Sequence, residues 1–247
     1  MGEPTPSSIT PASSEYDHSA GVLIIEADTY GGLMPPPTAK HVAELSIYGD
    51  GLVVVGREEE GLSVGTDRVV ITGHLSEEEL KRLLSSIAEG GFFQLEDRYL
   101  PSPAAPDMPW RHVIVNLLDT SKTVSIYPFD FAGAPQAFWD VYNQVVELYP
   151  SDAAVFTPTS GTLTATDLGP IDDLPAGQGS QVAPWDTPLV GITLPEATDG
   201  AYLQNQQYEV VEEFLLRYPP GQLFGSQEGQ AYRVLLEADL PWEDTKP

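Results

Sequence analysis

The stretch from residue 75 to residue 95, LSEEELKRLLSSIAEGGFFQL, carries the most explicit folding signal in the chain. Ser76 and Glu79 have the spacing of a capping box, in which each side chain bonds the other residue's backbone N–H. The glycine pair at 90–91 provides a left-handed residue to end the helix. An apolar stripe runs between these ends at helical spacing: Leu80, Leu83, Leu84, Ile87 and Ala88. Such a helix needs an apolar surface to cover, and we expect the strands on either side of it in the sequence to provide that surface.

Strand patterns flank this helix on both sides. Residues 21–27 read as a first strand, residues 42–56 as a hairpin that turns at Gly49-Asp50-Gly51, and residues 68–72 as a short strand. Residues 111–127 form a second hairpin with β-branched residues on both arms. A second helix follows from Pro135 to Pro150. Because the order hairpin–helix occurs twice, we predict an α+β fold, ββαββα-like, with a mostly antiparallel sheet and two helices on one face.

The rest of the chain divides by composition. Residues 1–19 are rich in Pro, Ser and Thr and are expected to be a disordered tether. Residues 20–150 hold the main α+β domain, and residues 151–181, with weak periodicity and many glycines and prolines, are expected to be an irregular linker. Residues 182–247 predict a strand at 189–194, a helix at 205–218 and a strand at 232–238. This strand–helix–strand part is too small a core to fold alone, so we expect it to pack on the first domain.

Charge and composition exclude several classes of function. The chain has 37 acidic and 11 basic residues, a net charge of −26, which argues against nucleic acid and against an anionic membrane surface. A protein or a cationic ligand is a better expected partner than a small molecule, and calcium is the one candidate cofactor. Cysteine is absent, which excludes thiolate catalysis and disulfides. No run approaches the ~20 apolar residues of a transmembrane helix.

The common catalytic signatures are missing. The sequence has no H-E-x-x-H, no G-x-S-x-G, no Walker loop and no G-x-G-x-x-G. The four histidines are His18, His41, His74 and His112, none at a helical i, i+4 spacing, and each is expected to be a surface or strand-edge residue. Paired carboxylates are expected by chance in so acidic a chain. If the first two strands are neighbours, Glu26, Asp28 and Asp50 form one speculative calcium cluster.

One stretch combines several kinds of chemistry. Residues 107–112, DMPWRH, place an acid, an aromatic ring, a cation and an imidazole at the mouth of a predicted strand, where functional loops often lie. Asp107, Trp110, Arg111 and His112 are therefore the candidate ligand contacts. The alternative is structural: Trp110 covers the edge of the sheet and Arg111 pairs with a nearby acid.

The order of strand, Tyr48-Gly49-Asp50-Gly51 turn, capped helix, Gly91-Phe92-Phe93, hairpin and Pro135 helix resembles a loose class of uncharacterised bacterial exported domains, often lipoproteins. The resemblance covers roughly residues 20–150, implies no catalytic residues, and departs from lipoproteins because the chain lacks a cysteine to carry the lipid. It implies an extracytoplasmic location, in the periplasm or at the cell surface, with a lipid anchor ahead of the tether; a cytoplasmic protein is the alternative. We expect a non-enzymatic binding or interaction module of a bacterial envelope protein. The alternatives are a calcium-stabilised structural protein and a hydrolase with dispersed carboxylates.

Overall fold

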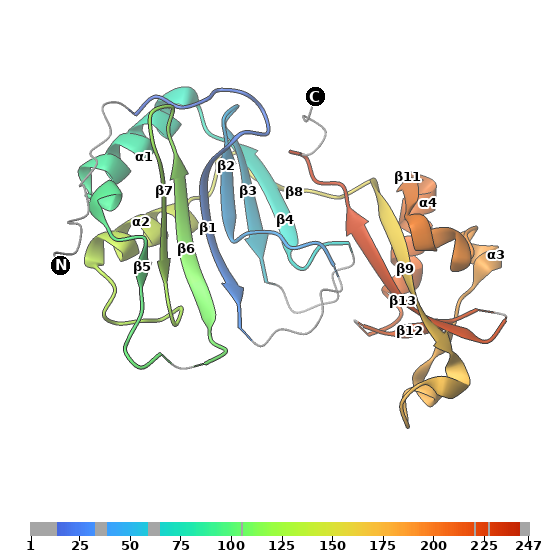
Figure 1. The fold of residues 1–247 in the computed structure, drawn as a ribbon. Coiled ribbons are helices and arrows are strands. Elements are labelled where there is room, and N and C mark those ends of the chain that lie inside the picture. The colour runs from blue at the N-terminus through green and yellow to red at the C-terminus, as the bar shows by residue number, and fades with distance from the viewer. Residues whose placement is uncertain are drawn as a thin grey trace.

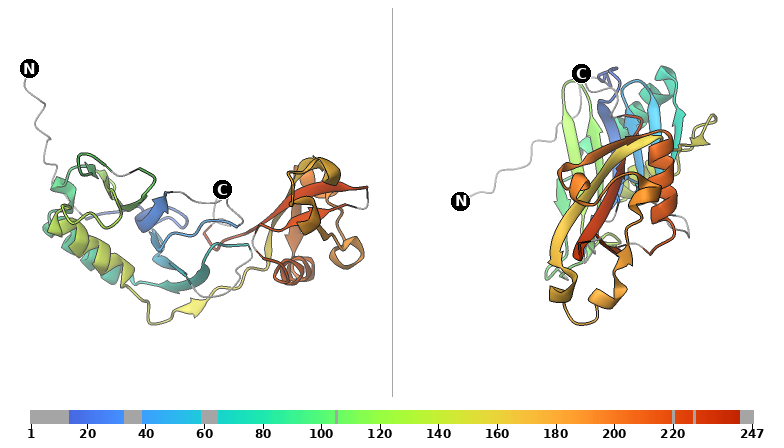
Figure 2. Two further views of the ribbon diagram at one scale, coloured as in Figure 1. Left: turned by 90° about the horizontal axis from the view of Figure 1, so that it is seen from below. Right: turned by 90° about the vertical axis from the view of Figure 1, so that its right-hand side faces the viewer.

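The computed structural model describes residues 14–32, 39–58, 65–104, 106–219, 221–226 and 228–242. The fold is α+β, as predicted, with two mostly antiparallel sheets that each have their own helices (Figure 1). We call the eight-stranded sheet with helices α1 and α2 the large lobe, and the five-stranded sheet with α3 and α4 the small lobe. The two lobes lie end to end (Figure 2).

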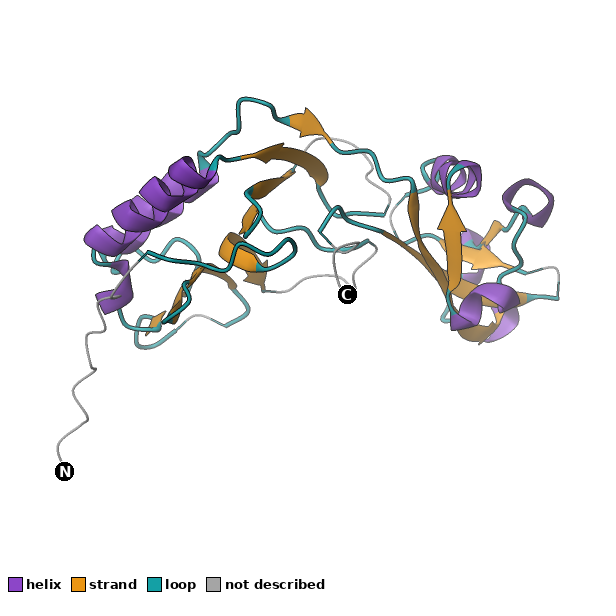
Figure 3. Cartoon of the chain, turned by 90° about the horizontal axis from the view of Figure 1, so that it is seen from above, coloured by secondary structure: helices purple, strands orange, loops and turns teal. Residues whose placement is uncertain are grey.

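The large lobe is built from the first part of the chain. Its strand order is β5-β7-β6-β1-β2-β3-β4-β8, and only the β5–β7 pair is parallel. The elements are β1 (Leu23–Gly31), β2 (Leu45–Tyr48), β3 (Leu52–Arg57), β4 (Val69–His74), α1 (Glu77–Glu89), a 3₁₀ turn (Phe92–Gln94), β5 (Arg98–Tyr99), β6 (Pro109–Asn116), β7 (Ser121–Ile126), α2 (Gln136–Val146) and β8 (Ala154–Val155). Both helices cover the same face of the sheet, as predicted (Figure 3).

Helix α1 forms as its sequence predicts. Ser76 N donates to Glu79 Oε2 at 2.8 Å, and the Ser76 hydroxyl accepts from Glu79 N at 3.3 Å, so the capping box is complete. Of the two glycines, Gly91 takes the left-handed conformation, with φ 81°. Four leucine and isoleucine side chains of the stripe are buried between α1 and the sheet: Leu80, Leu83, Leu84 and Ile87. They join Phe138 and Val145 of α2 in one core.

The small lobe has the strand order β10-β12-β13-β9-β11. Its elements are β9 (Ser160–Pro170), 3₁₀ turns at Ile171–Asp173 and Gly179–Gln181, β10 (Ala183–Pro184), α3 (Thr187–Val190), a 3₁₀ turn (Pro195–Asp199), β11 (Ala201–Gln204), α4 (Gln206–Leu215), β12 (Leu223–Gly225) and β13 (Gln230–Ala238). The predicted helix and last strand correspond to α4 and β13. The strand predicted at 189–194 is wrong, because Asp186 caps the short helix α3 and Gly191, with φ 75°, ends it.

Residues 151–181 do not form the irregular linker that composition predicts. Strand β8 pairs with β4 at the edge of the large sheet, and β9 lies between β13 and β11 in the small one. In β9 the buried positions are Gly161, Leu163 and Ala165, which alternate with half-buried threonines. Small buried residues beside β-branched polar ones give a true period of two with little hydrophobic contrast. The pattern therefore escapes a search for apolar alternation.

The predicted tether also extends too far. Residues 1–13 lie outside the described residues, but residues 14–19 pack on the large lobe. Tyr16 is buried in the main core, its ring stacks on His18 at 4.2 Å, and Leu118 N donates to the Glu15 carbonyl at 2.9 Å. Burial of one tyrosine ring supplies enough apolar contact to order this short segment.

The end of the described chain returns to the large lobe. After β13, Leu240 and Trp242 cover the sheet face opposite α1 and α2, which we call the open face. Trp242 stacks on Tyr48 at 5.5 Å, and Ala238 N donates to the Gly65 carbonyl at 3.1 Å. Apolar side chains from three strands meet them there: Tyr48, Leu52, Val54 and Val70.

Candidate binding cleft

A cleft of about 970 Å³ opens at one end of the large sheet. Strands β1 and β3 end there and β2, β4 and β6 begin there, because each strand is antiparallel to its neighbour (Figure 1). Side chains from five strands and from α2 therefore meet in one place. The lining residues are Thr29, Gly31, Gly32, His41, Glu44, Val55, Gly56, Arg57, Glu58, Asp67, Arg68, Asp107, Pro109, Arg111, Phe129 and Val146.

The cleft exists because β2 is short. Pairing of β1 with β2 stops at Ala27 and Leu45, so among the described strands β1 from Asp28 to Gly31 pairs with β6 alone. Before β2 the chain turns out of the sheet and runs beside residues 65–67, where Lys40 N donates to the Gly65 carbonyl. Neighbouring strands lie about 4.8 Å apart, so β1 and β3 are roughly 10 Å apart across β2. Gly56 N of β3 still donates to the Ala43 and Glu44 carbonyls, and the cleft lies between these residues and β1, where Thr29 and Gly31 line it.

An ion network with a buried Asp28–Arg68 pair at its centre fixes the wall on the open-face side. Asp28 is 3% exposed, and its Oδ1 accepts from Arg68 Nη1 at 2.9 Å and from Glu44 N at 3.2 Å. Arg68 Nη1 also donates to the Val42 carbonyl at 2.7 Å. His41 Nε2 lies 2.6 Å from Asp28 Oδ2. The network ties β1, the approach to β2 and the start of β4 to one another.

The same network sets the charges of its members. Hydrogen bonds to Asp28 and to Asp67 raise the pKa of His41 to about 10, so the imidazole is cationic at neutral pH. Burial alone would raise the pKa of Asp28, but the bonds from His41 and Arg68 outweigh burial and the pKa falls below its ordinary value. His41 Nδ1 lies 2.5 Å from Asp67 Oδ2, so the ring bridges two carboxylates. An imidazole with both nitrogens occupied in this way is a structural cation.

The helix-side wall is built around Arg111. Its Nε donates to Thr29 Oγ1 at 3.2 Å, and its guanidinium carbon lies 4.5 Å from the centre of the Tyr142 ring. The rings of Phe129 and Trp139 lie 5.3 Å and 5.7 Å away. Tyr142 donates its hydroxyl proton to Glu44, and burial together with this bond raises the pKa of the tyrosine. Thr29 and Asp28 are adjacent on β1 and point to opposite faces, so the cleft passes between the two polar walls.

The structure separates the four predicted ligand contacts. Asp107 and Arg111 line the cleft, and Asp107 has a left-handed backbone with φ 57°. Trp110 and His112 point to the opposite face of β6, since successive residues of a strand alternate between faces. Trp110 packs on Tyr127 at 4.8 Å. The alternative interpretation of Arg111 expected an acid partner; among the described residues it has none, and aromatic rings lie around its guanidinium.

The residues proposed for calcium do not meet. Glu26 Oε1 is 3.1 Å from His112 Nε2, and Asp28 is committed to Arg68 and His41. Asp50 lies in the turn between β2 and β3, at the other end of the sheet, where its carboxylate accepts from Leu52 N. Among the described residues, no group of three or more His, Cys, Asp or Glu is arranged to hold a metal ion. The prediction for Asp50 is wrong because it assumed only that β1 and β2 are neighbours and not which of their residues lie side by side.

The register also brings a serine opposite a histidine. Ser125 of β7 faces His112 of β6, and Glu26 binds the same imidazole. Nδ1 of His112 is buried and has no hydrogen-bond partner in the described part of the chain, and Ser125 is itself buried. A serine nucleophile needs a base in hydrogen-bond contact and room for a substrate. This row of residues meets neither condition.

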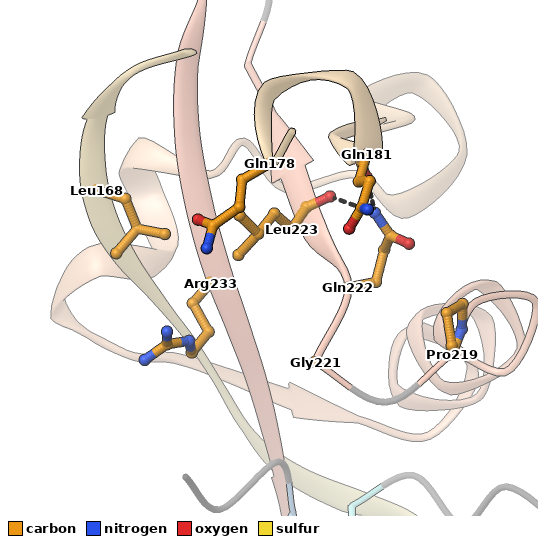
Figure 4. A pocket seen from close by; sticks show the side chains of 8 residues that line it. All are labelled: Leu168, Gln178, Gln181, Pro219, Gly221, Gln222, Leu223 and Arg233. Atoms are coloured by element: carbon orange, nitrogen blue, oxygen red, sulfur yellow. Dashed lines mark hydrogen bonds between the residues drawn. The ribbon is translucent and has the colours of Figure 1, made fainter. Parts of the chain in front are cut away.

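A second, smaller hollow of about 300 Å³ lies in the small lobe (Figure 4). Gln222 Nε2 donates to the carbonyls of Gln181 and Leu223, and these two bonds hold the side-chain amide of Gln222 in place. Gln178 and Arg233 extend their side chains on the other side of the hollow (Figure 4). At this volume the hollow is at the lower limit for a small-molecule site. The cleft of the large lobe is the larger and better fixed of the two.

Comparison with protein families, with curated proteins and with solved structures finds no match to this chain. Within the described ranges, no helix has both the length and the apolar character needed to cross a membrane. Sequence reasoning missed His41, Glu44, Asp67, Arg68 and Tyr142 as parts of the cleft. None of them belongs to a sequence motif, and the hydrogen-bond partners of their side chains lie 13 to 98 positions away in the chain.

Proposed function

We propose that this chain is a non-enzymatic binding module of a bacterial envelope protein, and that it binds an extended segment of a partner protein in the cleft beside β1. The observation that carries the proposal is the edge of β1 from Asp28 to Gly31, which within the described residues pairs with β6 on one side only. A free strand edge presents unpaired backbone groups, and an incoming peptide gains affinity by pairing with them.

The dimensions and the lining of the cleft support an extended ligand. The cleft runs beside the last residues of β1 and has a volume of about 970 Å³. Gly31 and Gly32 line the cleft and add no side chain to it. The ion network around Asp28 and the ring cluster around Arg111 keep the two walls apart without a ligand, so little order has to be gained on binding.

The envelope location rests on the composition of the first residues, which is typical of a tether between an anchor and a folded domain. The non-enzymatic role rests on the state of the titratable groups in the cleft. His41 is held between two carboxylates and Tyr142 is bonded to Glu44, so neither is available to transfer a proton. A partner protein fits this site better than a substrate does.

The test is selection of binders from a displayed library of random ten-residue peptides, followed by amide NMR mapping on the whole chain. We expect shifts at residues 28–31 and 55–58. The backbone nitrogens of a selected peptide are then methylated one at a time. Methylation should abolish binding at every second position, because strand pairing uses alternate N–H groups. Selected peptides that perturb only amides outside the cleft, or that tolerate methylation everywhere, would show that strand pairing beside β1 is not the binding mode.

A further inference from the structure

Arg111 is held in position while part of its hydrogen-bonding capacity stays unused. Its Nε is bonded to Thr29, and the rings of Tyr142, Phe129 and Trp139 surround the guanidinium. No ion pair joins Arg111 to any carboxylate of the described residues, although the chain has 37 acidic residues. The two Nη atoms remain as donors. Cation–π contacts with three rings fix the plane of the group before any ligand arrives.

A guanidinium with a fixed plane is a receptor for a carboxylate. The planar fork of arginine matches the two oxygens of a carboxylate and bonds both at once. Arg57 stands at the end of β3, with its guanidinium carbon 5.0 Å from the centre of the Tyr149 ring, and no carboxylate of the described residues forms an ion pair with it. Arg68, by contrast, is already bonded to Asp28 and to the Val42 carbonyl. Within the described residues, two of the three arginines in the cleft therefore have no carboxylate partner.

We infer that the segment bound beside β1 carries an aspartate or glutamate whose carboxylate forms a two-point pair with the Arg111 guanidinium. The inference rests on the proposed function and adds the chemistry of the partner. Glu58 and Asp107 also line the cleft, and both are exposed. Their negative charge opposes a run of acids, so the expected motif is a single acidic residue among neutral ones.

The net charge of the protein gives this inference a distinctive salt dependence. A chain of charge −26 repels an acidic peptide at long range, whereas the contact with half-buried Arg111 is short-range. The Debye length falls from about 10 Å at 0.1 M salt to about 6 Å at 0.3 M, which screens the repulsion more than the contact. Affinity for the peptide should therefore hold or rise between 50 and 300 mM NaCl. A cationic partner would lose affinity over the same range.

The experiment measures binding of a fluorescein-labelled peptide selected on the whole chain, beside the same peptide with Glu→Gln or Asp→Asn. The acidic peptide should bind about tenfold or more tightly, since a hydrogen-bonded charge contributes roughly that factor. With Arg111→Gln the two peptides should bind equally, and Arg111→Lys, which keeps the charge and loses the fork, should recover only part of the preference. Arg82→Gln on α1, an exposed arginine far from the cleft in the fold, is the matched control and should change neither affinity.

The outcomes separate the two proposals. Cleft-binding peptides that show no preference for the acid overturn the inference and leave the proposed function standing. Absence of any cleft-binding peptide overturns both. A competition with millimolar free glutamate is the third outcome. If glutamate displaces the labelled peptide as effectively as unlabelled peptide does, the ligand is a small carboxylate and the inference is overturned. Thermal melts show whether the Arg111 variants fold. If they do not fold, Arg57→Gln tests the same chemistry at an exposed position, and it should weaken binding of the acidic peptide a few-fold.

Discussion

Replacing Asp28 with asparagine should destabilise the large lobe by about 3–5 kcal/mol, because it leaves a buried arginine without its counter-charge. Asp28 is 3% exposed and Arg68 is 8% exposed. Glu58 is 3.8 Å from Arg68 and 87% exposed, so it compensates little, and Asp67 and Glu44 act on Arg68 only through weaker, longer-range attraction. Asparagine keeps the size of the side chain but offers one acceptor oxygen in place of two, and its amide nitrogen meets donors from His41 or from Arg68.

Urea unfolding at pH 7, followed by circular dichroism and by tryptophan fluorescence, measures the loss. Asp97→Asn is the matched control, because Asp97 pairs with Lys122 at 2.6 Å while 81% exposed, and such pairs contribute about 0–1 kcal/mol. The two lobes have separate cores, so the slope of each transition must be compared as well as its midpoint.

Two results would refute the reasoning. The first is a loss of unfolding free energy for Asp28→Asn that exceeds the loss for Asp97→Asn by less than about 1 kcal/mol, the range of an exposed ion pair. The other comes from Asp28→Leu combined with Arg68→Met. Apolar residues of similar volume can replace a buried pair with little loss, so the double variant should be more stable than Asp28→Asn. If it is less stable, the charge of Arg68 is not what makes Asp28 necessary.

Four further predictions concern other parts of the molecule. The pKa of His41 in the folded state is about 10, above its ordinary 6.5, so its stabilisation is complete below pH 6.5 and is lost as pH rises through 10. The side chain is 49% exposed, so the difference in urea stability from His41→Gln should be about 1–2 kcal/mol at pH 6 and vanish by pH 11; a constant difference would contradict it. Ser76→Ala should cost about 1 kcal/mol in a thermal melt through loss of the α1 cap, and an unchanged melt would contradict that role. Leu240→Ala should cost about 2–5 kcal/mol, since it leaves a cavity on the open face of the large sheet, and a smaller loss would mean that the site collapses around the gap. Calcium chloride should raise the melting temperature no more than sodium chloride of equal ionic strength does, and a larger rise would reveal a site elsewhere in the chain.

The local part of the fold could be predicted from the sequence, since its causes lie within a few residues of one another. The cap, stripe and end of α1 span residues 76 to 91 and follow their pattern in every detail. Strand β9 could not be predicted, because its buried face consists of glycine, alanine and a single leucine. Its status as a central strand depends on β13 and β11, which lie far along the chain.

The candidate site divides in the same way. The loop from Asp107 to Arg111 could be selected from its mixture of residue types, but the pairing of β6 with β1 decides which side chains reach the cleft. Trp110 and His112 fail for this reason alone. The cleft itself follows from where β2 begins, and that depends on the turn of the chain near Lys40 toward residues 65–67. A single sequence contains no record of such a long-range contact.

The position of Leu240 and Trp242 on the open face has a consequence for synthesis. Translation releases Val70 from the ribosome about 170 residues before Leu240, an interval on the order of ten seconds at typical elongation rates. During that interval the large sheet can close on its helices, but Leu52, Val54 and Val70 remain uncovered. We expect a nascent chain with this exposed apolar patch to be prone to aggregation until residues 240–242 have left the ribosome. The synthesis of residues 240–242 therefore determines when the newly made protein stops exposing this apolar surface.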